Sequence, residues 1–391
     1  MIPAVMPTYG RTDIAFERGE GAYIFDTDGN RFLDFGTGIA VTCLGHAHPH
    51  LVAALTEQAG KLWHCSNLYR IPGQERLAER LVAASFADSV FFCNSGAEAV
   101  ECGLKMVRKY QDSLGNSEKY RIITCESGFH GRTLATISAG GNPKHREGFG
   151  PAIDGFDHVA FGNLNEVRNA ITDQTGAILV EPIQGEGGIN LADPAYFQGL
   201  RQTADEFGLA LFFDEVQTGI GRTGKLFAHE WTGITPDVVA VAKGVGGGFP
   251  VGACLAVEKC AEVLVPGTHG STFGGNPLAV AAANAVLDVI MEDGFLDHVQ
   301  KMADHLAAEL NRVAGAHPDK LGEVRGGGLL QGVKCAVPNM DLVNALIERG
   351  MLTVPAGDNV VRFIPPLIIE EAHVAEAMNI LDDACGALPA P

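Results

Sequence analysis

Basic residues are scarce in this chain of 391 residues. It has 28 lysines and arginines against 47 aspartates and glutamates, which gives a formal net charge of −19. Proteins that bind nucleic acids need a basic surface to neutralise phosphates, so we expect no nucleic-acid partner. An anionic small molecule would have to be held by a few local arginines against the field of the whole protein.

Long apolar runs and paired cysteines are also missing. No stretch of about 18 uninterrupted apolar residues predicts a membrane span. The first residues, MIPAVMPTYGRTD, have no basic region followed by an apolar one, so no secretion signal is expected. The nine cysteines form no C-x-x-C pair. We interpret them as reduced thiols of a cytoplasmic protein without a disulfide framework, and we expect no membrane partner.

Two motifs are too weak to assign a function. Residues 219–224 have the glycine spacing of a dinucleotide-binding loop, but several residues separate them from the preceding predicted strand and no helix clearly starts there. The alternating histidines of residues 46–50 are interrupted by a proline and have no cysteine or carboxylate at a ligand spacing. We interpret them as histidines hydrogen-bonded around a loop and predict no metal site.

Strands and helices alternate from about residue 74 onward. The predicted strands are apolar along their whole length, which indicates a parallel sheet covered by helices on both faces. The sequence therefore predicts an α/β large domain. Its predicted strands span residues 89–95, 120–126, 176–182, 209–216 and 237–243, and its predicted helices include 74–85, 96–111 and 276–292.

Both chain ends are expected to form a second, smaller α+β domain. A hairpin is predicted over residues 20–35, because two apolar runs flank the turn signal Asp28-Gly29-Asn30. A late strand pair is predicted around residues 327–334 and 359–367. The large domain is predicted to span residues 51–280, and the small domain to combine residues 1–50 and 281–391.

A lysine follows one of the predicted strands and precedes a glycine-rich hinge, in AVAKGVGGGFPVGA. The flanking pattern places Lys243 in the interior, where desolvation lowers the pKa of a lysine toward the neutral amine that forms Schiff bases with carbonyl groups. A lysine that extends from a strand end to water would give the same pattern. This stretch alone favours neither interpretation.

Asp214 adds a second element. It ends the apolar run in LALFFDEVQTG, at the carboxyl edge where open α/β sheets bind ligands. A buried carboxylate needs a cationic or donor partner. A pyridinium nitrogen is suitable, because a carboxylate beside it keeps it protonated and lets the ring withdraw electrons. Taken alone, Asp214 would be interpreted as a helix cap or an ion-paired residue.

Two glycine-containing segments complete the pattern. In residues 93–99, CNSGAEA, a strand is followed by a helix whose free amides can hold a phosphate, and Gly96 permits close approach. In residues 128–133, GFHGRT, Phe129 can stack on a flat ring, although a core position would suit it equally. The four elements together specify a phosphate, a flat ring, a ring nitrogen that needs an anion and an aldehyde that needs a lysine. The predicted ligand is pyridoxal 5′-phosphate.

The runs FFDEVQTGIGRTG and DVVAVAKGVGGGFPVGA resemble the signature of the class-III pyridoxal-phosphate aminotransferases, and the likeness covers essentially the whole chain. The segments NSGAEA, GFHGRT, EPIQGEGG, STFGGNP and VVRFIPP are most similar to the acetylornithine aminotransferases of arginine biosynthesis. The resemblance implies the fold-type I architecture, with a mostly parallel seven-stranded sheet in the large domain. It also implies a homodimer whose active sites are shared across the interface.

The resemblance implies roles for the matching coenzyme residues. Lys243 would carry the coenzyme, Asp214 would pair with the pyridinium nitrogen, and Phe129 would stack on the ring. The other matches are Ser95, Gly96 and Ala97 at the phosphate, Glu215 and Val216 in the segment after Asp214, Gln217 near the ring hydroxyl, and Thr272, which would reach the phosphate of the neighbouring subunit.

The same resemblance implies the substrate residues. Arg362 would clamp the α-carboxylate of glutamate, and Arg132 the carboxylate of an acylated diamino acid, since a guanidinium forks onto a carboxylate with two hydrogen bonds. Glu186 would pair with Arg362 while the ω-amino substrate is bound and release it for glutamate. Ser271 would lie next to the substrate. Without the resemblance, surface ion pairs would explain both arginines.

Ile39 and Tyr9 bear on the kind of amine that is accepted. Ornithine aminotransferases carry a tyrosine before GHxHP that contacts the free α-amino group, whereas FGTGIAVTCLGHAHP places Ile39 there. An apolar residue suits an N-acyl group better than an ammonium. Tyr9, in PTYGR, would contribute to the same wall of the pocket.

The expected reaction is a ping-pong transfer of the ω-amino group between N2-acetyl-L-ornithine and 2-oxoglutarate, with Lys243 as general base and acid. The products would be N-acetyl-L-glutamate 5-semialdehyde and L-glutamate. Alternatives within the enzyme class are the N-succinyl-diaminopimelate, succinylornithine, ornithine and 4-aminobutyrate transaminases. A catalytically silent binding protein on the same scaffold is the alternative of another class, and an intact lysine, aspartate and phosphate segment argues against it.

Overall fold

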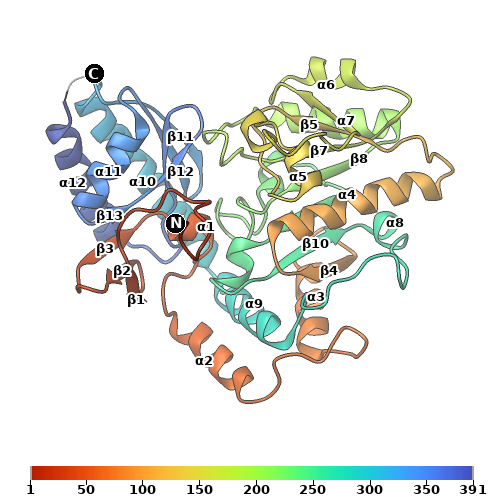
Figure 1. Ribbon diagram of the computed structural model, residues 1–391, viewed down its shortest axis with the longest axis horizontal. Coiled ribbons are helices and arrows are strands. Elements are labelled where there is room, and N and C mark those ends of the chain that lie inside the picture. Colours follow the sequence, from red (N-terminus) through yellow and green to blue (C-terminus); the bar gives the residue numbers. More distant parts are fainter. Residues whose placement is uncertain (1, 390–391) are drawn as a thin grey trace.

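The computed structural model describes residues 2–389 (Figure 1). Its centre is a seven-stranded sheet in which five neighbouring strands run parallel, and a sixth, β10, is antiparallel to both of its neighbours. In order across the sheet, the strands are β4 (Ser89–Cys93), β10 (Gly252–Ala256), β9 (Val238–Val241), β8 (Ala210–Asp214), β7 (Thr175–Val180), β5 (Arg121–Cys125) and β6 (Phe156–Val159). The mostly parallel α/β sheet predicted from the sequence is confirmed.

Two strands of this sheet were not located by the sequence pattern. β10 consists of GACLA, whose small residues have little β propensity. β6 consists of FDHV, in which an aspartate and a histidine interrupt the apolar run. The other five strands overlap the predicted segments, because each contains an apolar run, and four of them, all except β4, are almost entirely buried.

Helices cover both faces of the sheet, as predicted (Figure 1). On one face, α4 (Gly96–Ser113) forms an apolar cluster with Phe212 of β8. On the other face, α7 (Pro194–Phe207) and α9 (Pro277–Ile290) belong to a cluster that contains Phe213. Successive side chains of a strand point to opposite faces, so these two neighbouring phenylalanines attach β8 to both helical layers.

Gly103 sets how closely α4 approaches the sheet. A Cβ atom at this position would collide with the ring of Phe212. Phe212 lies two residues before Asp214 on the same strand. The contact therefore helps to fix the depth of α4 relative to the end of β8, where the predicted site lies.

Five further helices belong to this part of the chain. α3 corresponds to the helix predicted at 74–85, and α2 and α3 both pack against α9. The remaining three are short connections around the sheet. The five helices are α2 (Pro49–Ala59), α3 (Pro72–Ala83), α5 (Leu134–Ala139), α6 (Leu164–Ala170) and α8 (Glu258–Ala261).

Both chain ends form the other part of the fold, coloured red and blue in Figure 1. One four-stranded sheet contains β1 (Phe16–Glu20), β2 (Tyr23–Asp26), β3 (Arg31–Asp34) and β13 (Met351–Leu352). A second contains β11 (Leu321–Gly327), β12 (Leu330–Cys335), β15 (Val360–Phe363) and β14 (Val354–Ala356). The accompanying helices are α10 (Phe295–Ala316), α11 (Asn339–Glu348) and α12 (Glu371–Ala387).

The predicted pairings in this part are confirmed. β2 and β3 form the N-terminal hairpin, and β12 and β15 form the late antiparallel pair. β13 pairs parallel with β3, so segments from the two ends of the chain share one sheet. The domain boundaries at residues 50 and 280 stay predictions.

Within the described residues, no helix combines the length and apolar character needed to cross a membrane. In the same part of the chain, no group of three histidine, cysteine, aspartate or glutamate side chains is arranged to hold a metal ion. Two of the alternating histidines contact different carboxylates: Nε2 of His46 lies 2.8 Å from Oδ2 of Asp34, and Nε2 of His50 lies 2.9 Å from Oδ2 of Asp288. All nine cysteines are free thiols.

Candidate active site

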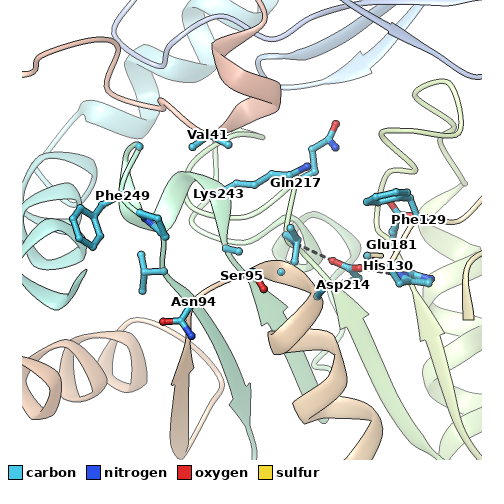
Figure 2. A pocket seen from close by; sticks show the side chains of 18 residues that line it. Val41, Asn94, Ser95, Phe129, His130, Glu181, Asp214, Gln217, Lys243 and Phe249 are labelled. Carbon is cyan, nitrogen blue, oxygen red and sulfur yellow. Dashed lines mark hydrogen bonds and ion pairs between the residues drawn. The ribbon is translucent and has the colours of Figure 1, made fainter. Parts of the chain in front are cut away.

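Most of the predicted coenzyme residues lie at one edge of the large sheet (Figure 2). The parallel strands β7, β8 and β9 end there, and α4 begins there after β4. Open α/β sheets bind ligands at this edge. The side chains surround a cavity of about 330 Å³, a size typical of small-molecule sites. Of the predicted set, the cavity is lined by Ser95, Gly96, Ala97, Phe129, Asp214, Val216, Gln217 and Lys243.

Lys243 lies two residues after the end of β9 and has a φ of 50°, a left-handed conformation that is uncommon for a residue with a side chain. Its side chain extends across the cavity toward Gln217 (Figure 2). Burial is the main cause that lowers the pKa of Lys243, and the negative charge of Glu186 opposes the shift. The amine is therefore closer to its neutral, nucleophilic form than an exposed lysine would be.

Asp214 is a buried carboxylate with a buried histidine as its partner. Its Oδ2 lies 2.8 Å from Nδ1 of His130, and its Oδ1 accepts a hydrogen bond from the amide of Val216 at 3.0 Å. Burial disfavours the charged form of His130. The hydrogen bond and the charge of Asp214 outweigh that penalty, so the pKa of His130 is raised. Both carboxylate oxygens of Asp214 are thereby held in a fixed orientation in the cavity wall.

Glu181 is the first residue after β7 and lies in the same cavity wall as this pair. It is buried, and its Oε1 accepts a hydrogen bond from the amide of Phe129 at 2.9 Å. Burial and the negative charge of Asp214 raise the pKa of Glu181 to about 8, although His130 opposes the shift. Glu181 is therefore mostly protonated at neutral pH and adds no full negative charge to the wall.

The start of α4 presents backbone amides to the cavity. Ser95 caps the helix, and its hydroxyl oxygen accepts a hydrogen bond from the amide of Glu98 at 3.3 Å. Gly96 and Ala97 occupy the first turn, where helical geometry leaves the amides without an acceptor inside the helix. A Cβ atom at Gly96 would meet Val216 at 2.7 Å, so glycine permits this close approach. Such a helix end suits an anion such as a phosphate.

A second cavity of about 770 Å³ shares Phe129 with the first. Arg132 and Glu186 line it. The guanidinium carbon of Arg132 lies 5.5 Å from the centroid of the Phe129 ring. Arg132 is exposed and takes part in no ion pair within the described part of the chain. It is therefore available to an anionic ligand in this cavity.

Arg362, on β15, is fully buried and is held by Glu186 through two hydrogen bonds. Its Nη1 and Nη2 donate to the two carboxylate oxygens of Glu186 at 2.7 and 3.1 Å, and Nη1 also donates to Oε1 of Gln217 at 3.0 Å. Burial raises the pKa of Glu186, but the positive charge of Arg362 outweighs it and the pKa is lowered overall. Glu186 therefore stays ionised and remains paired with the guanidinium of Arg362.

Glu215 is turned away from both cavities. Its carboxylate accepts hydrogen bonds from the amides of Ala228 and His229 at 2.6 and 2.9 Å, and from the hydroxyl of Thr218 at 3.1 Å. These buried donors need an acceptor, which explains the direction of the side chain. The side chain of Glu215 therefore anchors the following loop and lines neither cavity, and a role of this residue in binding the coenzyme stays a prediction.

Arg362 lines neither cavity itself, and four further predicted residues also lie outside both. Tyr9 is 76% exposed and Ile39 is 39% exposed, with a left-handed φ of 68° in the short turn α1 (Thr37–Ala40). The expected apolar wall is therefore not formed by these two residues within one chain. Thr272 is exposed. Oγ of Ser271 lies 3.2 Å from Nδ2 of Asn94 at the margin of the smaller cavity. Their roles at a substrate or in a neighbouring subunit stay predictions.

Several residues of the site were missed from the sequence. Glu181 ends an apolar run as Asp214 does, so the same signal was present. His130 lies inside GFHGRT, where the aromatic residue beside it is the more conspicuous feature. Phe249 and Pro250 line the smaller cavity from the glycine-rich loop after β9, and no sequence pattern indicated them.

Comparison with known proteins decides the family. The model of the family described as "Aminotransferase class-III" matches residues 5–385. The chain belongs to the class-III aminotransferases. "Acetylornithine aminotransferase 1" of Bradyrhizobium diazoefficiens is 58% identical over 386 residues, which cover 99% of this chain and 95% of that relative.

Solved structures of aminotransferases are similar over nearly the whole chain. N-acetylornithine aminotransferase from Stenotrophomonas maltophilia K279a has a TM-score of 0.86 at 39% identity, covering 97% of each chain. Ornithine aminotransferase from Toxoplasma gondii, described with partial occupancy of pyridoxal phosphate at its active site, has a TM-score of 0.93 at 32% identity, covering 98% of this chain and 92% of its own.

Class-III aminotransferases use pyridoxal 5′-phosphate, and the smaller cavity fits this coenzyme. The amide-bearing start of α4 matches its phosphate, and the ring of Phe129 matches its flat ring. The carboxylate of Asp214 matches the ring nitrogen, and the desolvated amine of Lys243 matches the aldehyde. The Nε2 atom of His130 is buried without a partner among the described residues, as expected at a binding site that is completed by a ligand.

The raised pKa of Glu181 predicts pH-dependent stability. The pKa of an unperturbed glutamate is 4.5 and that of Glu181 is about 8. At pH values between the two, the folded protein therefore binds one proton more than the unfolded protein does. The stability of the coenzyme-free protein should therefore fall as pH rises through this window. Glu181→Gln removes the titration and keeps an oxygen for the amide of Phe129. In thermal unfolding, the Tm difference between the variant and the wild type should be a few degrees more favourable to the variant at about pH 8.5 than at about pH 5.

Glu126→Gln serves as the control, because Glu126 is an exposed glutamate after the neighbouring strand β5. Its Tm difference from the wild type should not vary with pH in this way. A Tm difference for Glu181→Gln that is constant across the window would contradict the assignment of a proton to Glu181.

Proposed function

We propose that this aminotransferase moves the ω-amino group between N2-acetyl-L-ornithine and 2-oxoglutarate, in arginine biosynthesis. The products are N-acetyl-L-glutamate 5-semialdehyde and L-glutamate. The observation that carries the proposal is the presence of two arginines at the site, an open one at Arg132 and a covered one at Arg362. The name of the Bradyrhizobium relative supports the same substrate.

Pyridoxal 5′-phosphate, when bound, supplies the carbonyl that takes up the amino group and the ring that stabilises negative charge on the carbon losing a proton. Lys243 would hold the coenzyme, and its lowered pKa favours an amine that can take a proton from the substrate carbon and return it. Asp214, oriented by His130, keeps the ring nitrogen protonated.

The remaining cavity residues position the coenzyme. The amides of Gly96 and Ala97, with the hydroxyl of Ser95, would hold the phosphate at the start of α4. Phe129 would stack on the ring. Gln217 would bind near the ring hydroxyl, and Val216 closes the wall beside Gly96.

Two arginines are needed because the two amino donors differ in shape. In N-acetylornithine the reacting amine is at the opposite end of the molecule from the α-carboxylate, so Arg132 in the outer cavity holds that group. In glutamate the reacting amine and the α-carboxylate share one carbon, so Arg362 clamps the carboxylate close to Lys243. Glu186 keeps Arg362 paired while the first substrate is bound, and Arg362 becomes available when Glu186 moves aside.

Other ω-amino substrates present a distant carboxylate to Arg132 as well. They are N-succinyl-diaminopimelate, succinylornithine, ornithine and 4-aminobutyrate. Arg132 alone does not distinguish among these amines. The relatives named for acetylornithine favour the acetylated substrate among them.

We further propose that the protein works as a homodimer in the cytoplasm. Several large apolar side chains are exposed on two segments, including Trp63 at 63%, Leu68 at 86% and Phe273 at 60%. Nδ2 of Asn67 donates hydrogen bonds to the carbonyl oxygens of Ser271 and Gly274 at 3.0 and 2.9 Å, so the two segments lie side by side. An exposed apolar group of this kind favours a protein–protein contact.

A substrate panel tests the proposed reaction. With 2-oxoglutarate as acceptor, N-acetyl-L-ornithine should give the highest kcat/KM among the acylated and free amines named above. Lys243→Ala should lose turnover by several orders of magnitude and should show no coenzyme adduct in mass spectrometry after borohydride reduction. Lys61→Ala, at an exposed lysine on the protein surface, should behave as the wild type. A clear preference for another amine would replace the substrate assignment.

The two arginines should divide the half-reactions. Arg362→Lys keeps the charge and loses the forked contact, so kcat/KM for glutamate should fall roughly 10- to 100-fold, with a smaller effect on N-acetylornithine. Arg132→Lys should give the reverse pattern, and each variant is the matched control for the other. Equal losses in both half-reactions, measured in single turnovers, would refute the division of roles.

Oligomeric state is checked by sedimentation. The wild type should have twice the mass of the 41.2 kDa chain. Leu68→Asp places a charge in the apolar segment and should shift the equilibrium toward the monomer with loss of activity. A fully active monomer would argue against shared active sites.

A further inference from the structure

The larger cavity contains an imidazole that the proposed transfer does not use. His145 ends a short 3-10 turn, η1 (Pro143–His145), and lines this cavity together with Arg132. Its ring meets Phe129 edge to face, with centroids 5.7 Å apart and an interplanar angle of 89°. The guanidinium carbon of Arg132 lies 5.5 Å from the centroid of the same ring. His145 and Arg132 therefore flank one aromatic ring in one cavity.

The surroundings hold His145 as a neutral donor. Burial lowers the pKa of its imidazole, and the positive charge of Arg132 lowers it further. Nε2 lies 3.4 Å from Nδ2 of Asn142, whose Oδ1 accepts a hydrogen bond from the backbone of Lys144. A ring nitrogen that faces a donor is the acceptor, so the proton of the neutral ring is on Nδ1. Within residues 2–389, Nδ1 has no hydrogen-bond partner.

We propose that His145 selects the acylated substrate by donating a hydrogen bond from Nδ1 to the amide carbonyl oxygen of the acyl group. This inference rests on the proposed function. In an N-acyl amino acid the amide and the carboxylate are attached to the same carbon, so the carbonyl oxygen is only a few bond lengths from the carboxylate that Arg132 holds. A donor that shares the cavity wall with Arg132 is placed to meet it.

A free α-amino group does not make this contact. An ammonium has only donors, so it cannot accept the Nδ1 proton of a neutral imidazole. A site built to pair with a substrate group rejects the analogue that lacks it, because the polar group of the site is then left unpaired. His145 thereby discriminates N-acetylornithine from ornithine at a position where Ile39 and Tyr9 of the same chain do not reach.

Binding of two unreactive ligands tests the proposal on the coenzyme-loaded enzyme. N-acetyl-L-norvaline and pentanoate have the same carbon chain and carboxylate, lack the reacting amine, and differ only in the acetylamino group. His145→Phe keeps an aromatic ring against Phe129 and removes the donor. It should raise the dissociation constant of N-acetyl-L-norvaline roughly three- to tenfold, while pentanoate binds as before.

Two further variants separate hydrogen bonding from packing. His145→Gln retains a side-chain N–H and should recover part of the lost affinity. Lys144→Ala, at the exposed neighbour in the same turn, should bind both ligands as the wild type does. In steady-state kinetics, His145→Phe should raise the KM of N-acetylornithine, with kcat within about twofold and the KM of glutamate unchanged.

The outcomes distinguish this inference from the proposed function. Equal weakening of the two ligands by His145→Phe, or unchanged binding of N-acetyl-L-norvaline, overturns the role of His145 while the wild type still uses N-acetylornithine. A wild type that does not turn over N-acetylornithine overturns the proposed function and this inference together.

Discussion

The removal of one amine from water, at Lys243, is the constraint on which the rest of the site depends. The pKa of this amine stays lowered only if the carboxylates near it do not restore it by stabilising the charged form. Three carboxylates face it, and each is compensated: Asp214 is paired with His130, Glu186 with Arg362, and Glu181 is mostly protonated at neutral pH. Burial therefore remains the main influence on the pKa of Lys243. Buried charges that are paired in this way also avoid the penalty of an isolated ion.

The fold brings these groups together through a simple repetition. β7, β8 and β9 are parallel neighbours, and each ends in or is followed by one ionisable residue: Glu181, Asp214 and Lys243. Adjacent strands lie about 4.8 Å apart, so three such ends make a row at one edge of the sheet. The start of α4 lies at the same edge and presents amides there. The three apolar strands thus place their ionisable residues at or just after their carboxyl ends, where these residues form a row.

The sequence predicted the sheet and most of the smaller cavity because both depend on local patterns. Apolar runs located five strands, and the residue types at their ends indicated Lys243 and Asp214. The partners His130 and Arg362 could not be assigned in this way, since pairing across distant segments depends on packing. The direction of a side chain is equally non-local: Glu215 neighbours Asp214 but turns to buried amides of a later loop.

One short loop serves both cavities. Phe129 separates them, His130 pairs with Asp214 on the coenzyme side, and Arg132 faces the outer cavity, while Glu181 holds the backbone of Phe129. These neighbouring positions therefore cannot change independently during evolution, because an adjustment made for a new amine would disturb the grip on the coenzyme. Residues 141–145 and 355–358 of the outer cavity do not line the smaller cavity. Substitutions at these residues can therefore change the substrate preference within this family without disturbing the coenzyme site.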